Sequence, residues 1–443
     1  MTDSASHDYR TATQTTGSAP LRAAIAGSVG TFIEFYSFSV YGFMALVIAD
    51  LYFPGENRTA ALLSTLLVLA SAWLLKPVGG IVFGHIGDKF GRKPALLAAV
   101  LCMGVASFAI GLLPTYATLG AGATVLLVIA RLIQGLSAGG EIAGSVTLIS
   151  ESVPSRKRGF YGAFTPFGSI MGFAVGAAVV GLLNTLATSE QIHEWAWRLP
   201  FLTSLPITLM CLWIRKSIVE TLDTTVAHRE KRSTLRRALT EDRPALAKTM
   251  ALSVATNGTV YIGLAYISIH LITRVGYTES SVYWVSAAVI AVTGIGMLGG
   301  GYLADRIGLV RITTLGFIGF AVLTVPAMAL MGVSLWVAAL CYFAVLGNTI
   351  LVQTGVFSLV PRLFGPATRY TGVAVGWNMG DIVAGGTAPY IAVWLVANTG
   401  FDLSPGIFVI AVSCIGLAAL ASVKSGAGKD KSRDVEPDLT KVE

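Results

Sequence analysis

Long apolar runs alternate with short polar breaks along almost the whole chain, and this pattern predicts membrane-spanning helices. The runs reach about 20 residues or more, the length that an α-helix needs to cross the hydrocarbon core of a bilayer. Breaks rich in Pro, Gly or charge separate twelve expected helices, at roughly 22–49, 59–85, 94–113, 122–150, 158–184, 197–216, 246–272, 280–304, 311–331, 335–361, 369–397 and 402–423. We therefore expect an all-α membrane protein.

One connection differs from the others and divides the predicted helices six and six. Residues 217–245 are long, polar and basic, with the run His228-Arg229-Glu230-Lys231-Arg232 near their centre. We expect two pseudo-symmetric six-helix halves, 21–216 and 246–423, joined by 217–245 as a cytosolic linker. The polar stretches 1–20 and 424–443 are expected to be disordered cytosolic tails.

Composition supports a membrane protein and narrows the function classes. The 443 residues are 54% hydrophobic and 12% charged, with a mean hydropathy of +0.71, whereas soluble domains carry about 25% charged residues. The four cysteines lie inside apolar runs at wide spacing, which predicts neither a disulfide framework nor a metal site. The net charge of +7 is concentrated in loops, so we expect no nucleic-acid partner.

The distribution of lysine and arginine predicts the orientation. An even number of crossings places both ends of the chain on one side, and most basic loop residues share that side. The opposite side has only Arg58, Arg198 and Arg274. By the positive-inside rule both termini are expected in the cytosol, in a multi-pass protein of the plasma membrane.

A charged hinge between the second and third predicted helices repeats in the second half. The first hinge contains Gly84, Asp88, Lys89 and Gly91, followed by Arg92 and Lys93. Its first four positions recur at the same spacing in the second half, as Gly301, Asp305, Arg306 and Gly308. Such repetition at about half the chain length indicates two similar halves. An acid at a helix end can accept hydrogen bonds from a neighbouring helix N-terminus or an arginine. We therefore expect a cytosolic gate at Asp88, Arg92, Lys93, Asp305 and Arg306, in addition to their role in topology.

Together with the twelve-helix pattern, these hinges resemble the major facilitator superfamily. Five stretches resemble, more narrowly, its metabolite:proton symporter branch of proline/betaine, α-ketoglutarate, citrate and shikimate carriers. They are Glu34-Phe35-Tyr36-Ser37-Phe38 with Tyr41-Gly42; Lys76 to Pro94; Arg131-Leu132-Ile133-Gln134-Gly135 to Gly139-Gly140-Glu141; Trp197-Arg198-Leu199-Pro200-Phe201; and Arg369-Tyr370-Thr371-Gly372 through Asn378 to Gly385-Gly386 and Pro389.

The resemblance implies a secondary transporter, not an enzyme, that takes up a small organic acid or zwitterion with a proton by alternating access. Two alternatives remain open: a proton-uncoupled facilitator or exporter of the same superfamily, and a membrane-embedded sensor. No ATP-binding sequence of the GxxxxGK[ST] type occurs. The expected partners are the substrate, the proton and the lipid bilayer, with no cofactor, metal or obligate protein partner.

Charged residues inside predicted helices are the strongest clue to the site, because each costs roughly 2.5–3.5 kcal/mol at the bilayer centre. Glu34 lies about 12 residues, roughly 18 Å, into the first helix, and Arg131 lies roughly 14 Å into the fourth from the other side. We expect these two side chains to form an ion pair near the midplane. Glu34 is then the expected proton carrier, because its carboxylate can take up a proton when Arg131 moves away. The alternative is a permanent ion pair that links two helices.

Ser37 and Asp381 depart from the branch that the chain resembles. The branch usually has an acid three residues after this glutamate, where this chain has Ser37, and it is uncharged where this chain has Asp381. Asp381 is expected to replace the missing acid in proton coupling. The alternatives are that it lines a water-filled cavity or contacts a cationic part of the substrate.

Two further charged residues and a set of polar residues complete the expected site. Glu141 follows Gly139 and Gly140 and is expected to pair with basic residues of the hinge as part of the gate, with a proton role as the alternative. Lys76 is expected to extend toward the cytosolic surface in a supporting role. Amide, phenol and indole groups at midplane depth are expected to line the substrate cavity, with helix packing as their alternative role: Tyr36, Asn257, Tyr261, Asn348, Gln353, Trp377 and Asn378.

Overall fold

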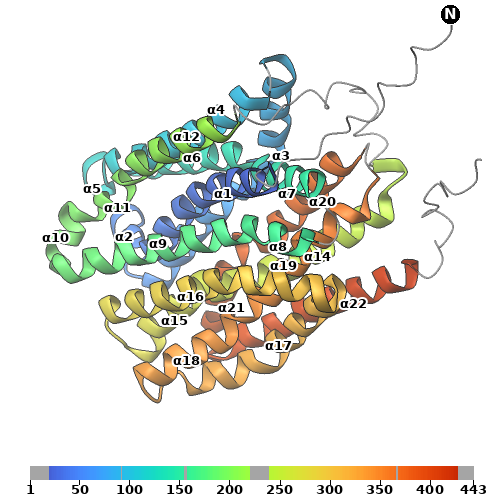
Figure 1. Cartoon of the computed structure of the whole chain (residues 1–443). Helices are drawn as coiled ribbons and strands as arrows, with labels where there is room; N and C mark the ends of the chain where they lie inside the picture. The colour runs from blue at the N-terminus through green and yellow to red at the C-terminus, as the bar shows by residue number, and fades with distance from the viewer. Residues whose placement is uncertain (1–18, 91, 154–156, 220–238, 366–367, 428–443) are drawn as a thin grey trace, which may run out of the picture.

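The computed structural model describes residues 19–90, 92–153, 157–219, 239–365 and 368–427. Figure 1 shows one elongated bundle in which the N-terminal helices, blue to green, lie beside the C-terminal helices, yellow to red. Helices are the expected element here, because each satisfies its own backbone hydrogen bonds where lipid offers no partners.

The N-terminal half contributes six crossings, several of them interrupted. The helices of this half are α1 (Ala19–Phe43), α2 (Ala45–Tyr52), α3 (Arg58–Phe90), α4 (Arg92–Leu112), α5 (Tyr116–Leu119), α6 (Ala121–Ala138), α7 (Glu141–Ser152), α8 (Arg158–Gly162), α9 (Phe164–Leu186), α10 (Ser189–Glu194), η2 (Ala196–Arg198), α11 (Leu199–Leu202) and α12 (Ser204–Val219).

The C-terminal half repeats this arrangement. Its helices are α14 (Arg243–Tyr261), η3 (Ile262–Tyr266), α15 (Ile267–His270), η4 (Leu271–Val275), α16 (Glu279–Ile307), α17 (Leu309–Leu330), α18 (Leu335–Leu346), α19 (Asn348–Leu359), η5 (Val360–Leu363), α20 (Arg369–Ala384), α21 (Thr387–Thr399) and α22 (Ser404–Ala427). The segments η3 and η4 are π-helical, so the seventh crossing is wider than an ideal α-helix in two places.

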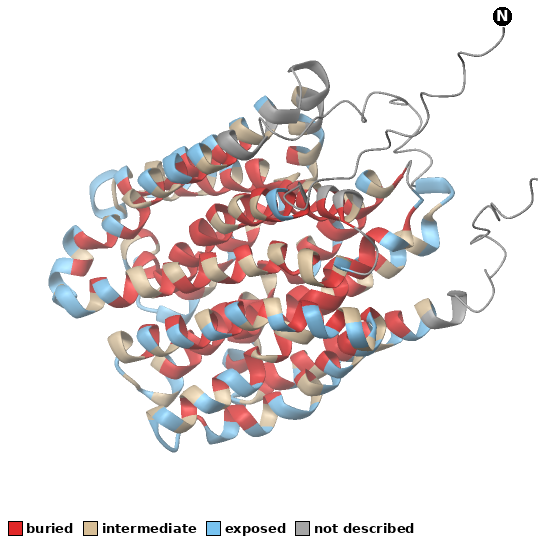
Figure 2. Cartoon of the chain, in the orientation of Figure 1, coloured by how far each residue is buried: buried red, intermediate tan, exposed pale blue. Residues whose placement is uncertain are grey.

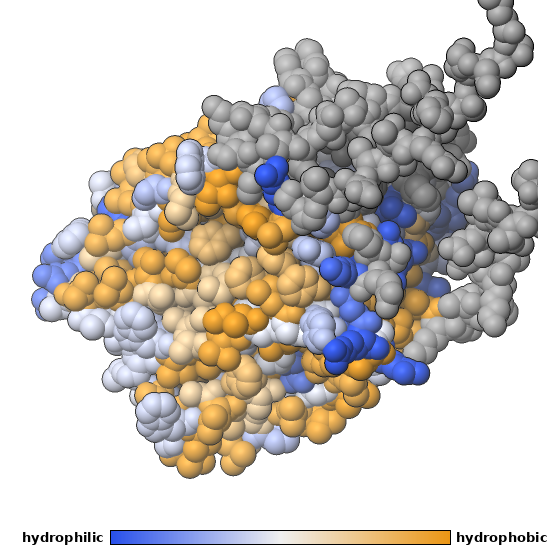
Figure 3. All heavy atoms as spheres, in the orientation of Figure 1, coloured by the Kyte–Doolittle hydropathy of each residue, from blue (hydrophilic) through white to orange (hydrophobic). Residues whose placement is uncertain are grey.

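The prediction of twelve crossings in two halves is confirmed. Within the described residues, 11 helical segments are long and apolar enough to cross a bilayer, and the shorter apolar helix Leu96–Leu112 supplies the twelfth. Figure 3 shows hydrophobic residues over the sides of the bundle and hydrophilic residues gathered toward its two ends. Figure 2 shows that the buried residues lie where helices face one another, so the outward apolar side chains face lipid.

The predicted boundaries of the linker and tails remain predictions. Residues 1–18, most of the linker (220–238) and the last residues, 428–443, lie outside the described residues. The helix α12 ends at Val219 and α14 begins at Arg243, on either side of that gap in the description.

The two halves contact each other at both ends of the bundle. At one end, which we call the Asp305 end, backbone N–H groups of Gly159 and Phe160 in α8 donate to the Asp305 carboxylate in α16, at 2.7 and 2.9 Å. At the other, the Tyr283 end, the Tyr283 hydroxyl in α16 donates to the Phe43 carbonyl of α1 at 2.9 Å. The two halves are therefore held together by hydrogen bonds at both ends of the bundle.

Close backbone contacts fix α3 against both halves. A Cβ atom on Gly135 of α6 would lie 1.7 Å from the Ala72 carbonyl oxygen of α3, so only glycine permits this approach. A Cβ on Gly386, in the break between α20 and α21, would lie 2.3 Å from the Trp73 ring. Helix α3 thus carries its side chains into the interface between the halves.

Candidate functional site

Lys76 lies at the centre of the molecule between two carboxylates. Its Nζ is 3.0 Å from Glu34 Oε1 of α1 and 3.3 Å from Asp381 Oδ2 of α20. All three side chains are buried, at 1–2% exposure. Because Glu34 belongs to the N-terminal half and Asp381 to the C-terminal half, this charged triad joins the halves.

The expected Glu34–Arg131 pair is therefore wrong. Lys76 is the cation beside Glu34, and Arg131 Nη1 instead donates to Gln134 Oε1 at 2.6 Å. The guanidinium carbon of Arg131 lies 4.3 Å from the ring centroid of Tyr41 and 5.1 Å from that of Phe38. Arg131 remains fully buried, so it is a second central cation held by an amide and by aromatic faces.

The expectation for Lys76 is also wrong, because the side chain does not extend to the surface. A lysine in the predicted last third of a helix can reach the interface, but Lys76 is oriented instead toward two carboxylates that neutralise it. The signal was present in the sequence, since a lysine inside an apolar run is costly unless it is paired. The sequence could not show which acids pair with it.

The C-terminal acid of the triad has further polar partners. Asn257 Nδ2 of α14 donates to Asp381 Oδ1 at 2.5 Å, and Ser253 Oγ lies 3.5 Å from the same oxygen. The structure therefore brings Asn257 into the centre, as expected. Asp381 contacts Lys76, which also contacts Glu34, so the three side chains form one buried cluster of charge.

Aromatic rings surround the triad and extend across the interface between the halves. Lys76 Nζ lies 5.4 Å from the Trp73 centroid and 5.5 Å from that of Phe38. Trp73 stacks on Phe38 and meets Tyr261 of the opposite half edge-on, at 5.6 Å between centroids. Phe173 contacts Tyr261 at 6.1 Å. The centre thus combines two cations, two carboxylates and several aromatic faces, and Tyr261 is in it, as expected.

Other residues expected in the cavity lie elsewhere or have packing partners. The Tyr36 hydroxyl donates to the Pro200 carbonyl at 2.9 Å and lies 2.5 Å from Thr203 Oγ1, which fixes α1 against α11 within one half. Asn348 Nδ2 donates to the carbonyls of Ala344 and Val345 and so stabilises the break between α18 and α19. For these two residues the alternative role, helix packing, describes the contacts better.

Three other residues expected in the cavity lie near the interface between the halves or are buried close to it: Trp377, Asn378 and Gln353. Trp377 packs on Phe357 at 5.0 Å between ring centroids, one turn before Asp381 on α20. Asn378 Nδ2 donates to the Gly139 carbonyl at 3.1 Å and so links the halves. Gln353 is buried on α19, and within the described residues its Oε1 has no hydrogen-bond partner.

Among the residues expected in the gate, Asp305 lies at a contact between the halves, and Glu141 lies elsewhere. Asp305 binds the first turn of α8 across the interface, whereas Arg306 is exposed and donates to Tyr302 of its own helix. Glu141, which was expected to pair with basic residues of the hinge, has Arg215 as its partner among the described residues. Both Glu141 oxygens accept from the Arg215 guanidinium of α12, with Nη2 to Oε2 at 3.1 Å, inside the N-terminal half.

The remaining gate residues cannot be placed. The side chains of Asp88, Arg92 and Lys93 lie outside the described residues. Arg215, at the end of the sixth predicted helix, was not among the expected site residues. Its 4% exposure shows that it is a buried ion-pair partner instead.

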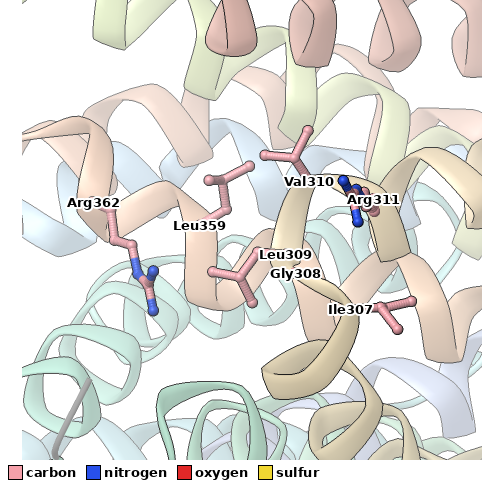
Figure 4. A pocket seen from close by; sticks show the side chains of 7 residues that line it. All are labelled: Ile307, Gly308, Leu309, Val310, Arg311, Leu359 and Arg362. Carbon is pink, nitrogen blue, oxygen red and sulfur yellow. The ribbon is translucent and has the colours of Figure 1, made fainter. Parts of the chain in front are cut away.

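A separate hollow of about 420 Å³ lies at the Asp305 end of the C-terminal half. Ile307, Gly308, Leu309, Val310, Arg311, Leu359 and Arg362 line it. Figure 4 shows Arg362 and Arg311 on either side of Leu309. The hollow shares no residue with the central charges, so we do not assign it to the same site.

Comparisons with known proteins agree with this architecture. The profile described as the Major Facilitator Superfamily matches residues 27–383. The chain is 34% identical over 431 residues to the proline/betaine transporter of Salmonella typhimurium, covering 92% of this chain and 84% of that one. It is likewise 34% identical over 431 residues to the glycine betaine/proline/ectoine/pipecolic acid transporter OusA of Dickeya dadantii, with the same coverage.

A third relative and a solved structure extend the comparison. The inner membrane metabolite transport protein YhjE of Escherichia coli is 35% identical over 416 residues, which cover 90% of this chain and 93% of that one. The structure of the proton:xylose symporter XylE bound to 6-bromo-6-deoxy-D-glucose superimposes with a TM-score of 0.69 at 17% identity, covering 92% of this chain and 96% of that one. At that identity the likeness concerns the fold.

Proposed function

Because this chain belongs to the major facilitator superfamily, in its metabolite:proton symporter branch, we propose that it carries a small zwitterion such as proline or glycine betaine together with a proton. The sequence-based prediction of a secondary transporter, rather than an enzyme, is confirmed by the family and by relatives that cover most of the chain. The cargo proposed here is that of the relatives, and the central charges support it.

The combination of charges at the centre suits a zwitterion. A zwitterionic cargo has one carboxylate and one ammonium group, and the centre has cations in Lys76 and Arg131 and anions in Glu34 and Asp381. Aromatic faces such as that of Trp73 stabilise a methylated ammonium, which cannot donate hydrogen bonds. A dicarboxylate or tricarboxylate would leave the buried acids without a cation to bind.

The triad also provides a means of coupling the proton to the cargo. When Glu34 is ionised it occupies Lys76. A proton on Glu34 removes that charge, and the carboxylate of the cargo can then take its place at Lys76. Binding of the proton thus raises the affinity for the cargo, and binding of the cargo raises the affinity for the proton; this is positive cooperativity, with a negative coupling free energy between the two sites. The proton role of Glu34 is therefore retained, with Lys76 replacing Arg131 as its partner.

Release of the Lys76–Asp381 ion pair would separate the halves. The two halves meet at the centre through this pair and at the Asp305 end through α8. We propose that the Asp305 end faces the cytosol, since Arg158, Arg306, Arg311 and Arg362 lie there. The protein would then reside in the cytoplasmic membrane with both termini in the cytosol, and Asp305 would belong to the cytosolic gate.

The experiment that tests the proposal measures cargo and proton movement together. Purified protein in proteoliposomes receives proline or glycine betaine, with citrate as the contrasting solute, and uptake and internal pH are recorded. We expect uptake of the zwitterions, internal acidification on their addition, and accumulation when the outside is acidified. Uptake without acidification would identify a proton-uncoupled facilitator and overturn the coupling. Transport of citrate in preference to both zwitterions would overturn the cargo class.

Glu34→Gln tests the proton carrier. We expect loss of proton-driven accumulation while exchange of labelled for unlabelled cargo continues, because glutamine fills the same space without binding a proton. Glu190→Gln is the matched control, since Glu190 is exposed in α10. Accumulation by Glu34→Gln at the rate of the unaltered protein would remove Glu34 from the mechanism.

A further inference from the structure

A small cavity lies between Glu34 and Glu141 inside the N-terminal half. Its volume is about 10 Å³, close to the space that one water molecule requires. Gly30, Ser137, Ala99 and Ala138 are among its lining residues, so its walls come from α1, α4 and α6, with Glu141 at the start of α7. It does not open on the interface where Lys76 meets Asp381.

The Glu34 carboxylate has an oxygen available to this cavity. Both Glu34 oxygens are buried without a hydrogen-bond partner among the described residues; Oε1 has the ion-pair contact with Lys76, whereas no ion-pair contact is made by Oε2 in that part of the chain. A buried carboxylate oxygen without a hydrogen bond is costly, and an ordered water is the usual partner for such a group. Glu141 and the Ser137 hydroxyl oxygen supply further polar partners in the same cavity.

Glu141 is held in place at the far side of the cavity. The Arg215 guanidinium binds both of its oxygens, and each oxygen retains a lone pair for another donor. Gly30, one turn before Glu34 on α1, lies against this ion pair: a Cβ there would be 2.6 Å from Arg215 Nη1 and 2.8 Å from either Glu141 oxygen. Glycine at this position lets the pair lie directly beside α1.

We propose that this cavity holds one water molecule that passes the transported proton from Glu34 to Glu141, so that the proton leaves through the N-terminal half. The O–H bond of protonated Glu34 breaks as the water accepts its proton, and the water gives a proton to the Glu141 carboxylate. Glu141 then releases it to solvent at the Asp305 end. Glu34 returns to the carboxylate and re-forms its ion pair with Lys76, and Arg215 favours the return of Glu141 to its charged form.

This route separates the proton from the cargo. The cargo crosses between the halves, whereas every lining residue of the cavity belongs to one half. Glu141 is thus a proton relay and not a gate contact. The inference rests on the proposed proton coupling at Glu34, and its test must distinguish failure of the relay from failure of the coupling.

The test compares net proton-coupled uptake with cargo exchange in proteoliposomes. For Glu141→Gln we expect net uptake and the accompanying internal acidification to fall about ten-fold or more relative to exchange, because exchange does not require the proton to leave. Glu141→Asp should restore part of the net rate. Equal loss of both activities in Glu141→Gln would show a structural role only and would overturn the relay.

A second variant tests the water without removing an acid. Ala99→Val fills the cavity with two methyl groups and should produce the same selective loss of net uptake. Ala98→Val is the matched control, since Ala98 is the neighbouring residue of α4 and faces outward. Normal net uptake by Ala99→Val would overturn the relay. If the unaltered protein transports cargo without moving protons, the proposed coupling itself fails, and the relay fails with it.

Discussion

Replacement of Lys76 by methionine is the most demanding test of the central charges. Methionine has about the length of the apolar part of lysine but lacks the ammonium that Glu34 and Asp381 share. Two buried carboxylates would then face each other without a cation. We expect Lys76→Met to lower the free energy of unfolding by about 3–5 kcal/mol, the range for removing one partner of a buried ion pair.

The distances indicate what a second substitution should do. At an effective dielectric constant of about 20, Lys76 attracts Glu34 at 3.0 Å by roughly 5.5 kcal/mol and Asp381 at 3.3 Å by roughly 5 kcal/mol before desolvation is counted. The two carboxylate oxygens are at most about 6.3 Å apart, because both contact one nitrogen, so without Lys76 they repel by at least about 2.6 kcal/mol.

Asp381→Asn should therefore have opposite effects in the two backgrounds. In the unaltered protein it removes a charged acceptor from Lys76 and Asn257, and should destabilise by about 1.5–3 kcal/mol. Combined with Lys76→Met it removes the repulsion, and should restore about 2–3 kcal/mol. The double variant is then more stable than Lys76→Met alone.

The assay is unfolding in mixed detergent micelles, with all four proteins of the cycle compared at one pH. Lys76→Arg keeps the charge and should lose less stability than Lys76→Met. Arg58→Met, at an exposed position at the start of α3, is the surface control and should change the free energy of unfolding by less than about 0.5 kcal/mol. If Asp381→Asn destabilises the Lys76→Met protein as much as it destabilises the unaltered one, the triad does not exist as described.

Three further predictions concern the gate, the interface and the cargo. Asp305→Asn should weaken the contact between the halves at the Asp305 end by about 1–2 kcal/mol, because the charge that binds two N–H groups of α8 is lost. The distance between spin labels on α8 and α16 should increase, and an unchanged distance would contradict this prediction. Gly386→Ala should slow transport and lower the free energy of unfolding by about 1–3 kcal/mol, because the new methyl group collides with Trp73. The transport rate and the thermal stability measure this effect. Gly299→Ala is the neutral control, because a Cβ there meets no atom within 4 Å. Arg131→Lys should raise KM for a zwitterion about ten-fold with a smaller change in maximal rate, because lysine lacks the planar guanidinium that binds Gln134 and lies against the Phe38 and Tyr41 rings beside the triad. An unchanged KM would show that Arg131 does not contribute to the cargo site.

The membrane explains why the helices were predictable in some detail. Apolar length alone determines where a chain can cross a bilayer, and the crossings predicted at 22–49 and 280–304 correspond to α1 with α2 and to α16. The same cost of burying charge predicted that Glu34, Arg131 and Asp381 would be functional candidates, and all three are buried. The cost of burying a charge does not indicate which side chain will pair with it.

The sequence did not predict the ion-pair partners of the buried charges, because these depend on which helix faces lie against each other. Glu34 and Arg131 have similar depths, but Arg131 is turned toward Gln134 and Tyr41, and Lys76 reaches the position expected for the arginine. Glu141 was expected to meet the hinge and meets Arg215. Depth is a one-dimensional quantity that sequence spacing supplies, whereas the rotation of each helix about its axis depends on packing against neighbours.

The sequence by itself determined a twelve-helix membrane protein of two halves, because apolar run length is a physical requirement of the bilayer that acts on each segment separately, and the resemblance of its motifs to a family supplied the transporter function. Only the tertiary structure decided that Lys76 bridges Glu34 and Asp381, and that Glu141 shares a cavity with Glu34. Those facts depend on the close approach of helices far apart in the chain, as at Gly135 and Ala72, where the absence of a side chain sets the distance.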